Sequence, residues 1–292
     1  MTTPASHDAG SDAPENAPQK ATEITPEIAR NRRFMHCPAF ENAMGESDQS
    51  RGIAAPAHAK LIEGLGEADI IRLEPFVDAD GKNTVVTSDA YTDLLDSRRS
   101  RRVYFDETLS QAQLAFMLWS AIGVQAFRGV DDCASLRPSP SGGARHPFNL
   151  YVAVRNVEGV EPGLYLYLPL GLAGENVGTK EVAITRVGAV EDYVSTITDM
   201  MAGQKWASRA PAVIVASCDA YRAEWRYEAA SHRVMLIDLG HLGQNLMLSA
   251  TAMGLGSCCM AAFDQQACDA TLNIDGINEY TVYAVSVGKA RA

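Results

Sequence analysis

The chain has 292 residues, of which 47% are hydrophobic and 21% charged, and its formal net charge is −11. That acidity argues against nucleic acid as a partner, because binding it requires a positive surface. We expect neither a secretion signal nor a membrane helix, since no apolar run approaches the roughly 20 residues that a span needs. The cysteines lack paired zinc spacing and the histidines lack metal-ligand spacing, so the expected protein is cytoplasmic, with reduced thiols and no metal.

The first part of the chain differs in composition from the rest. Residues 1–23 are rich in Ala, Pro, Ser and acidic residues but poor in large apolar ones, which predicts a disordered tail. Residues 24–97 mix basic, proline-containing and glycine-containing pieces, and we expect an arm with short elements. Residues 98–292 are predicted to form a single α+β domain without internal repeats.

The predicted elements of this domain begin with a helix over residues 110–123, in which a serine is placed to cap the start and a glycine to end it. A loop rich in Gly, Pro and Ser is expected at 127–147. Two β-like runs follow at 150–154 and 164–168, and they could pair as a hairpin.

Further along, the short β-branched run at 212–218 is typical of a buried central strand. Residues 229–253 follow a helical pattern that is apolar over most of its circumference, which predicts a buried helix. Gly254 ends that helix, a short loop follows, and residues 282–287 supply a last strand.

Four clusters could carry chemistry. The most informative is Arg98-Arg99-Ser100-Arg101-Arg102, because guanidinium groups match phosphate oxygens and the serine adds a donor. An isolated run of this kind is more often a solvated basic turn. The other clusters are rich in small residues or follow a strand, and could bring backbone amides or a cation to a ligand: Pro140-Ser141-Gly142-Gly143-Ala144, residues 254–263, and Gly288-Lys289.

These clusters occur in the order and spacing of the nitroreductase-like FMN oxidoreductases, a superfamily that the chain resembles from about residue 31 to residue 289. Within it, the chain most resembles the branch with azoline dehydrogenases, which oxidise thiazolines and oxazolines in ribosomally made peptides. The stretches that carry this resemblance are Ser47-Asp48-Gln49 with Gly52 and Pro56, and residues 118–123, 162–165 and 238–246.

The resemblance implies a mostly antiparallel sheet flanked by helices, in a homodimer with FMN at the subunit interface and NAD(P)H as electron donor. It implies phosphate and ribityl contacts from the arginine cluster and Lys289, ring contacts from the glycine loop and residues 256–262, and polar flavin contacts from the long helix. The implied FMN ligands are Arg98, Arg99, Ser100, Arg102, Pro140, Ser141, Gly142, Gly143, Gln244, Asn245, Gly256, Ser257, Ala261 and Lys289.

The catalytic residues implied by the resemblance are Arg226 and Tyr227. Azoline dehydrogenases of this branch carry a Lys-Tyr pair for substrate protons, and its position falls on these two residues. Arginine, with a pKa above about 12, cannot readily act as a general base. We therefore expect NAD(P)H-driven reduction of a small electron-poor or unsaturated molecule. Azoline dehydrogenation in peptide tailoring and a non-catalytic flavin carrier or sensor remain open as alternatives.

Some conspicuous side chains have a structural interpretation beside the functional one. Cys258 and Cys259 are expected to be buried and inert rather than redox-active. Trp119 is expected to pack in the core, and His241 could equally make a core hydrogen bond or a flavin contact. His146, beside the glycine loop, is a candidate for the substrate pocket.

Overall fold

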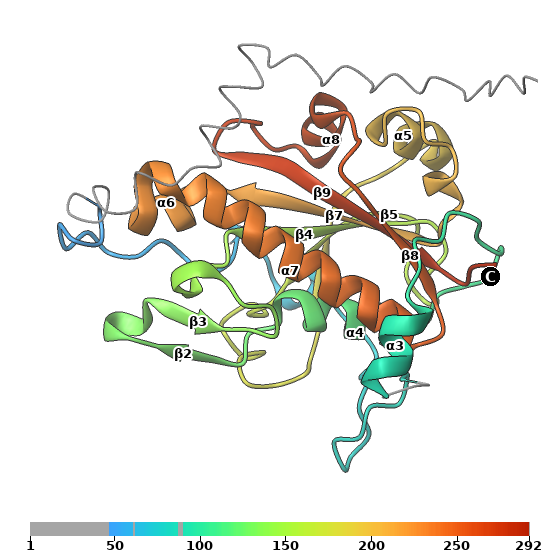
Figure 1. The fold of residues 1–292 in the computed structure, drawn as a ribbon, viewed down its shortest axis with the longest axis horizontal. Coiled ribbons are helices and arrows are strands. Elements are labelled where there is room, and N and C mark those ends of the chain that lie inside the picture. Colours follow the sequence, from blue (N-terminus) through green and yellow to red (C-terminus); the bar gives the residue numbers. More distant parts are fainter. Residues whose placement is uncertain (1–46, 61, 87–89, 292) are drawn as a thin grey trace, which may run out of the picture. The chain divides into compact units, whose positions relative to one another are not determined.

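The computed structural model describes residues 47–60, 62–86 and 90–291, and the tail predicted at 1–23 lies outside this part. A seven-stranded sheet in the order β1-β6-β5-β4-β7-β9-β8 forms its centre (Figure 1). Each neighbouring pair in this sheet is antiparallel. The α+β fold with a mostly antiparallel sheet flanked by helices is thus confirmed.

The strands and helices have the following bounds. The strands are β1 (Ile70–Arg72), β2 (Ala126–Arg128), β3 (Ala134–Leu136), β4 (Phe148–Val154), β5 (Gly163–Leu168), β6 (Ala183–Gly188), β7 (Ala212–Asp219), β8 (Gly256–Met260) and β9 (Glu279–Gly288). The helices are α3 (Tyr91–Ser97), α4 (Gln111–Ile122), α5 (Tyr193–Met200), α6 (Tyr221–Tyr227), α7 (Ser231–Ala252) and α8 (Gln265–Leu272).

Helices cover both faces of the sheet. Side chains such as Val152 and Ile214 pack in one core with α4 and α7, which lie on the same side of the sheet in Figure 1. Their neighbours Ala153 and Val213 pack in a second core with α5 and α8. Because successive residues of a strand point to opposite faces, both must be apolar when both faces are buried. This explains why the central strand β7 is a continuous apolar run.

Several sequence predictions are confirmed. The α4 helix begins after Ser110, whose hydroxyl accepts the Gln113 N–H at 3.2 Å. The two predicted β-like runs are β4 and β5, which pair antiparallel with Tyr151 opposite Leu166. The predicted central strand is β7, between β4 and β9, and the predicted last strand is β9.

Other predictions are wrong in part. The loop expected at 127–147 contains a two-stranded hairpin of β2 and β3, and the loop expected after Gly254 contains the edge strand β8. The β8 sequence, Gly-Ser-Cys-Cys-Met, has no β-branched residue and so lacks the usual strand signal. The helix expected to be buried leaves one side exposed, with Leu236 56% and Ile237 48% accessible.

The predicted arm also contributes to the sheet. Its strand β1 pairs with β6, with Ile71 opposite Ile184. Its helix α3 leads directly into the arginine cluster, because Arg98 is its C-terminal cap. No helix in the described ranges is long and apolar enough to cross a membrane.

Candidate functional site

The structure brings the arginine cluster to the edge strand β8. Ser100 and Ser257 form an isolated parallel bridge, and the Arg101 N–H donates to the Ser257 carbonyl at 2.9 Å. Residues more than 150 positions apart in the chain therefore lie side by side. Two of the clusters singled out in the sequence form one surface.

The side chains of this extended segment divide between two sides. Burial raises the pKa of the Cys258 thiol, and a hydrogen bond from Ser100 and the charge of Arg102 act in the opposite direction. Burial likewise raises the pKa of the Cys259 thiol to about 11, and the charge of Arg98 acts to lower it. Arg98, Ser100 and Arg102 are alternate residues of this segment, which runs beside β8.

Arg99 lies on another side of the same segment. Together with Arg101 it lines a cavity that also involves Arg291. The phosphate-binding set implied by the resemblance is therefore divided, since alternate residues of an extended chain point in opposite directions. Arg99 is not grouped with Arg98, Ser100 and Arg102.

The C-terminal segment joins the arginine cluster from a third part of the sequence. The Lys289 carbonyl accepts the Phe105 N–H at 2.8 Å, and Tyr104 and Ala290 form an antiparallel bridge. Lys289 itself is exposed. Its backbone is thereby fixed beside the chain that continues from Arg102.

The glycine loop is held by α7. The Ser141 hydroxyl donates to the Asp238 carboxylate at 2.6 Å, and the Gly142 N–H donates to the same carboxylate at 3.1 Å. Asp238 is buried, and burial raises its pKa while these two hydrogen bonds lower it. Asp238 begins the stretch 238–246 that carries the resemblance, but its sequence position alone gives no signal of a partner nearly a hundred residues away.

The two glycines of the loop are required by contacts with the protein itself. A Cβ on Gly143, where φ is +57°, would lie 2.5 Å from Cδ of Arg226 and 2.7 Å from the Tyr227 hydroxyl. A Cβ on Gly142 would overlap the side chain of Val234. The sequence interpretation was that these glycines admit a flat ligand. In the structure, the space beside each Cα is instead filled by a side chain from α6 or α7.

The implied catalytic pair therefore abuts the glycine loop. The Arg226 guanidinium lies over the Tyr227 ring, 5.4 Å from its centroid. Its Nη1 donates to the Gln49 side chain at 3.0 Å, whereas its Nε is buried and has no hydrogen-bond partner among the described residues. Arg226 and Tyr227 are thus held close to Gly143.

A buried arginine that sequence reasoning missed lies beside this pair. Arg145 is only 1% exposed, and its Nη2 is buried and has no hydrogen-bond partner in the part of the chain that the structure describes. Its guanidinium lies over the Trp225 ring, 4.5 Å from the centroid. Burial lowers the pKa of Arg145, and the charges of Arg226 and Arg222 lower it further. The only sequence signal was its position directly after the glycine run.

The polar residues of α7 are used differently. The Asn245 amide donates to the Ser120 carbonyl at 2.9 Å and to the Ser139 hydroxyl at 3.1 Å, so it links α7 to α4 and to the glycine loop. Gln244 is half-buried. Because it directly precedes Asn245 on the helix, its side chain lies on a different side of α7. Asn245 thus has a structural role, because it holds α7, α4 and the glycine loop together.

The loop after β8 remains open. Ala261 is exposed, whereas Gly256 and Ser257 are buried within the strand. Pro140, at the start of the glycine loop, is also exposed. The proposed ring-contacting backbone of residues 256–262 is therefore accessible only at its C-terminal end.

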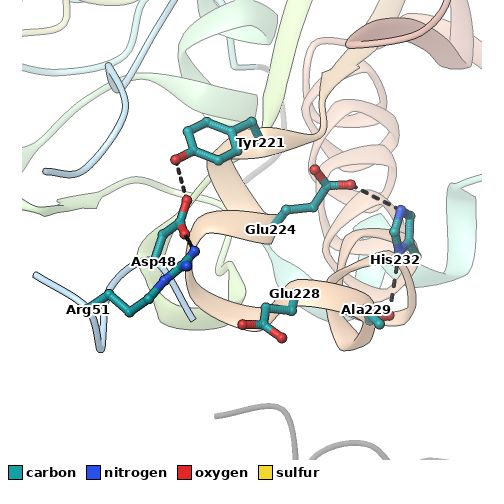
Figure 2. A pocket seen from close by; sticks show the side chains of 7 residues that line it. All are labelled: Asp48, Arg51, Tyr221, Glu224, Glu228, Ala229 and His232. Carbon is teal, nitrogen blue, oxygen red and sulfur yellow. Dashed lines mark hydrogen bonds and ion pairs between the residues drawn. The ribbon is translucent and has the colours of Figure 1, made fainter. Parts of the chain in front are cut away.

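An acidic pocket of about 360 Å³ lies on the outer side of α6 (Figure 2). Its Asp48 accepts a hydrogen bond from the Tyr221 hydroxyl at 2.6 Å and pairs with Arg51. The carboxylate of Glu224 pairs with His232 at 3.2 Å. Most charged groups of this pocket are thus satisfied by one another, and they do not suit an anionic cofactor.

The structural interpretations of the remaining side chains mostly hold. His146 is buried, its Nε2 lies 2.9 Å from the Ser135 carbonyl, and burial lowers its pKa to about 3. His146 is therefore a neutral core residue rather than a substrate contact. His241 is exposed. Trp119 packs against the core, as expected, and the raised thiol pKa values of the two cysteines accord with inert side chains.

Comparisons with known proteins identify related sequences and structures. The model of the nitroreductase family matches residues 95–289. The chain is 31% identical over 202 residues to MJ1384 of Methanocaldococcus jannaschii, which is named a nitroreductase, and this match covers 68% of the chain and 89% of that protein.

Two relatives process peptides, according to their names. The trifolitoxin-processing protein TfxB of Rhizobium leguminosarum bv. trifolii is 29% identical over 150 residues, and the match covers 51% of this chain and 38% of TfxB. The microcin B17-processing protein McbC of Escherichia coli is 27% identical over 157 residues, with coverages of 52% and 54%. The chain thus spans about half or less of either protein.

A solved structure shows the same fold. It is the E. coli microcin synthetase McbBCD complex with truncated pro-MccB17 bound, and the match to one of its chains has a TM-score of 0.55 at 17% identity. The match covers 92% of this chain and 95% of that one.

Proposed function

Because this chain belongs to the nitroreductase family, we propose that it is an FMN-dependent oxidoreductase that uses NAD(P)H to reduce a small electron-poor or unsaturated molecule. The observation that carries the proposal is the meeting of the Arg98–Arg102 segment with β8 and with Lys289. These segments are far apart in the sequence, and together they present cations and a hydroxyl on one surface.

The donors on this surface fit a phosphate group. Arg98, Ser100 and Arg102 are alternate residues of a segment that runs beside β8, and the Lys289 backbone is fixed beside the same segment. Charge-assisted hydrogen bonds from guanidinium groups suit phosphate oxygens, and a lysine adds a point charge. We assign these four residues to the FMN phosphate.

The glycine loop fits the ring end of the cofactor. Arg145 and Arg226 each hold a buried nitrogen without a hydrogen-bond partner in the described part of the chain. Cations placed near the ring stabilise the negative charge of a reduced flavin. When bound, FMN would supply the chemistry of hydride transfer between NAD(P)H and the acceptor. Tyr227, whose hydroxyl lies beside Gly143, is placed to donate a proton to the reduced acceptor.

A second copy of the chain completes this site in our proposal. The glycine loop contacts α7 through Asp238, whereas Cys259, which faces Arg98, lies 3.9 Å from the Gly243 carbonyl on another side of that helix. The outer side of α7 leaves Leu236 and Ile237 exposed. Burying such side chains against a second α7 is favourable, and twofold symmetry pairs like surfaces. Each cofactor would then contact the glycine loop of one copy and the arginine segment of the other.

Azoline dehydrogenation is a second candidate, favoured by the similarity to TfxB and McbC. In this reaction the substrate would be a peptide heterocycle and oxygen would reoxidise the flavin. The arginine at position 226 weighs against it. Its guanidinium is held by Gln49 and Tyr227, and an arginine does not readily release a proton.

The proposal is tested by recording the visible spectrum of the purified protein and then adding NADH or NADPH in the absence of oxygen. Rapid bleaching of a flavin spectrum would support the reductase. A flavin that resists both nicotinamides but is reduced by an azoline peptide would support the second candidate. A protein that takes up no FMN on reconstitution would refute both.

Variants at position 226 sharpen this test. Arg226→Lys restores the Lys-Tyr pair, and Arg226→Ala removes the cation. The reductase proposal expects Arg226→Lys to keep most of the NAD(P)H-dependent rate and Arg226→Ala to lose about tenfold, because a positive charge is what the site needs. If Arg226→Lys instead gains azoline oxidation, the second candidate is the better description.

A further inference from the structure

A second group of arginines surrounds a cavity that the proposed flavin site does not use. The cavity has a volume of about 230 Å³ and lies between the arginine segment, the end of α7 and the C-terminal segment. Arg99, Arg101 and Arg291 line it, together with the hydroxyl-bearing residues Ser97 and Thr251.

These three arginines have no acidic partner among the residues that the structure describes. Within the described residues none of them forms an ion pair with a carboxylate, although the chain as a whole carries a net charge of −11. Arg99 donates only to the carbonyl of its neighbour Arg98, at 2.8 Å. Arg291 lies over the Phe105 ring, 5.3 Å from its centroid. Three like charges around one cavity repel one another, and an anion in the cavity would offset that repulsion.

The C-terminal end of α7 does not supply that anion. Thr251, Gly254 and Leu255 bring this end to the cavity. A helix end carries only about half an elementary negative charge, which cannot offset three guanidinium groups. In the described structure, none of these guanidinium groups donates to a carbonyl of α7, so they are not caps for this helix.

We propose that this cavity is a second anion site, which takes a phosphomonoester or diphosphate group. Several converging guanidinium groups favour an anion with more than one charge, and hydroxyl groups add neutral donors. The cavity is smaller than the roughly 300 Å³ at which ligand pockets begin. It therefore holds the phosphate end of a ligand, or free phosphate, while the rest of a larger ligand stays outside.

This site is separate from the one assigned to the FMN phosphate. Arg99 and Arg101 line the cavity, whereas Arg98, Ser100 and Arg102, which alternate with them along the extended segment, do not. The inference therefore stands independently of the proposed function. Either of the two anion sites could exist without the other.

Calorimetric titration of FMN-saturated full-length protein with pyrophosphate tests the site. We expect one equivalent to bind, and Arg101→Gln and Arg291→Gln each to weaken binding about tenfold, the usual effect of losing a charge-assisted hydrogen bond. Arg128→Gln is the matched control. Arg128 is exposed and donates to the carbonyl of its neighbour Phe127 at 3.1 Å, as Arg99 does to Arg98, but it lines neither of the two cavities described above.

Absence of pyrophosphate binding, or equal binding by Arg101→Gln, Arg291→Gln and Arg128→Gln, would overturn the inference. Loss of pyrophosphate binding in Arg98→Gln alone would also overturn the inference, because the anion would then occupy the site assigned to the FMN phosphate. If Arg101→Gln and Arg291→Gln weaken pyrophosphate binding and Arg128→Gln does not, steady-state kinetics with NADH and NADPH identify the source of the phosphate. A KM that rises in Arg101→Gln for NADPH but not for NADH points to the 2′-phosphate of that cofactor. Unchanged KM values point to free phosphate or another phosphorylated ligand.

If the protein binds no flavin, the same titration still applies. The comparison of Arg98→Gln with Arg101→Gln then reports which side of the segment the anion occupies. Failure of the flavin proposal and failure of the second anion site are thereby distinguished.

Discussion

The hydroxyl of Ser141 donates to the carboxylate of Asp238 at 2.6 Å, across 97 positions of the sequence. The same hydroxyl accepts the His146 N–H at 3.0 Å. One helix side chain thereby fixes both ends of the glycine loop. The loop in turn places Gly143 against Arg226 and Tyr227, so the position of the implied catalytic pair depends on a bond that α7 provides.

Asp238→Asn should loosen this loop. The asparagine side chain has one oxygen to accept the hydrogen bonds that two carboxylate oxygens now share. Its NH2 group would face the Gly142 N–H, and two donors cannot bond to each other. We expect a loss of about 1–2 kcal/mol in the free energy of unfolding, measured by urea denaturation, and weaker FMN binding. Asp199→Asn is the control, since Asp199 is exposed on the α5 helix. Equal effects of the two variants would show that the Asp238 bond is unimportant.

Gly143→Ala should be costly for a steric reason. The new Cβ would lie 2.5 Å from Cδ of Arg226 and 2.7 Å from the Tyr227 hydroxyl. Gly203→Ala is a matched control, because φ is +83° there and nothing lies within 4 Å of the new Cβ. The control should lose about 1 kcal/mol from backbone strain alone. We expect Gly143→Ala to lose clearly more in thermal unfolding and to slow flavin reduction.

Arg98→Gln and Arg102→Gln should weaken FMN binding. Each removes a guanidinium from the side that faces β8, and loss of one charge-assisted contact to phosphate costs about tenfold in affinity. Flavin fluorescence during titration measures the dissociation constant. Arg128→Gln, far along the chain on β2, should bind FMN as the native protein does. Native affinity in both test variants would remove these arginines from the phosphate site.

Leu236→Glu should disrupt the proposed dimer. Leu236 is 56% exposed in the single chain, and a charge there would have to be desolvated at an interface. Light scattering after gel filtration should show a monomer, and FMN should be lost together with the partner copy. Ile277→Glu changes an even more exposed residue, at 78%, outside α7 and should leave the mass unchanged. A monomeric native protein that still binds FMN would contradict the proposed assembly.

Glu279→Gln should reveal a pH-dependent contribution to stability. The carboxylate accepts hydrogen bonds from Lys60 at 2.6 Å, Ser217 at 2.6 Å and Asn149 at 2.8 Å. Burial raises its pKa, but these bonds outweigh burial and hold the pKa below the ordinary 4.5. Its contribution is therefore present above about pH 4.5 and disappears as the pH falls through the lowered value.

We expect Glu279→Gln to lower the free energy of unfolding by about 2 kcal/mol at pH 7, because hydrogen bonds to a charged group are lost. The difference from the native protein should shrink as denaturation is repeated at lower pH. Exposed Glu158→Gln should show no such trend. A difference that stays constant with pH would contradict the lowered pKa.

The sequence by itself determined the elements with a strong local signal. The α4 helix followed from its serine cap and apolar period, and β7 followed from a β-branched run after a proline. It also determined which groups could bind phosphate, because guanidinium chemistry does not depend on the fold. These features rest on neighbouring residues, which the chain order already contains.

Only the tertiary structure decided which clusters meet and in which direction they point. It placed Ser100 beside Ser257, turned Arg99 away from Arg98, and filled the space beside Gly143 with Arg226. It also made a strand of β8, which has weak strand propensity but gains hydrogen bonds from β9. Such contacts join residues far apart in sequence, and local patterns carry no record of which distant partner supplies the stabilising interaction.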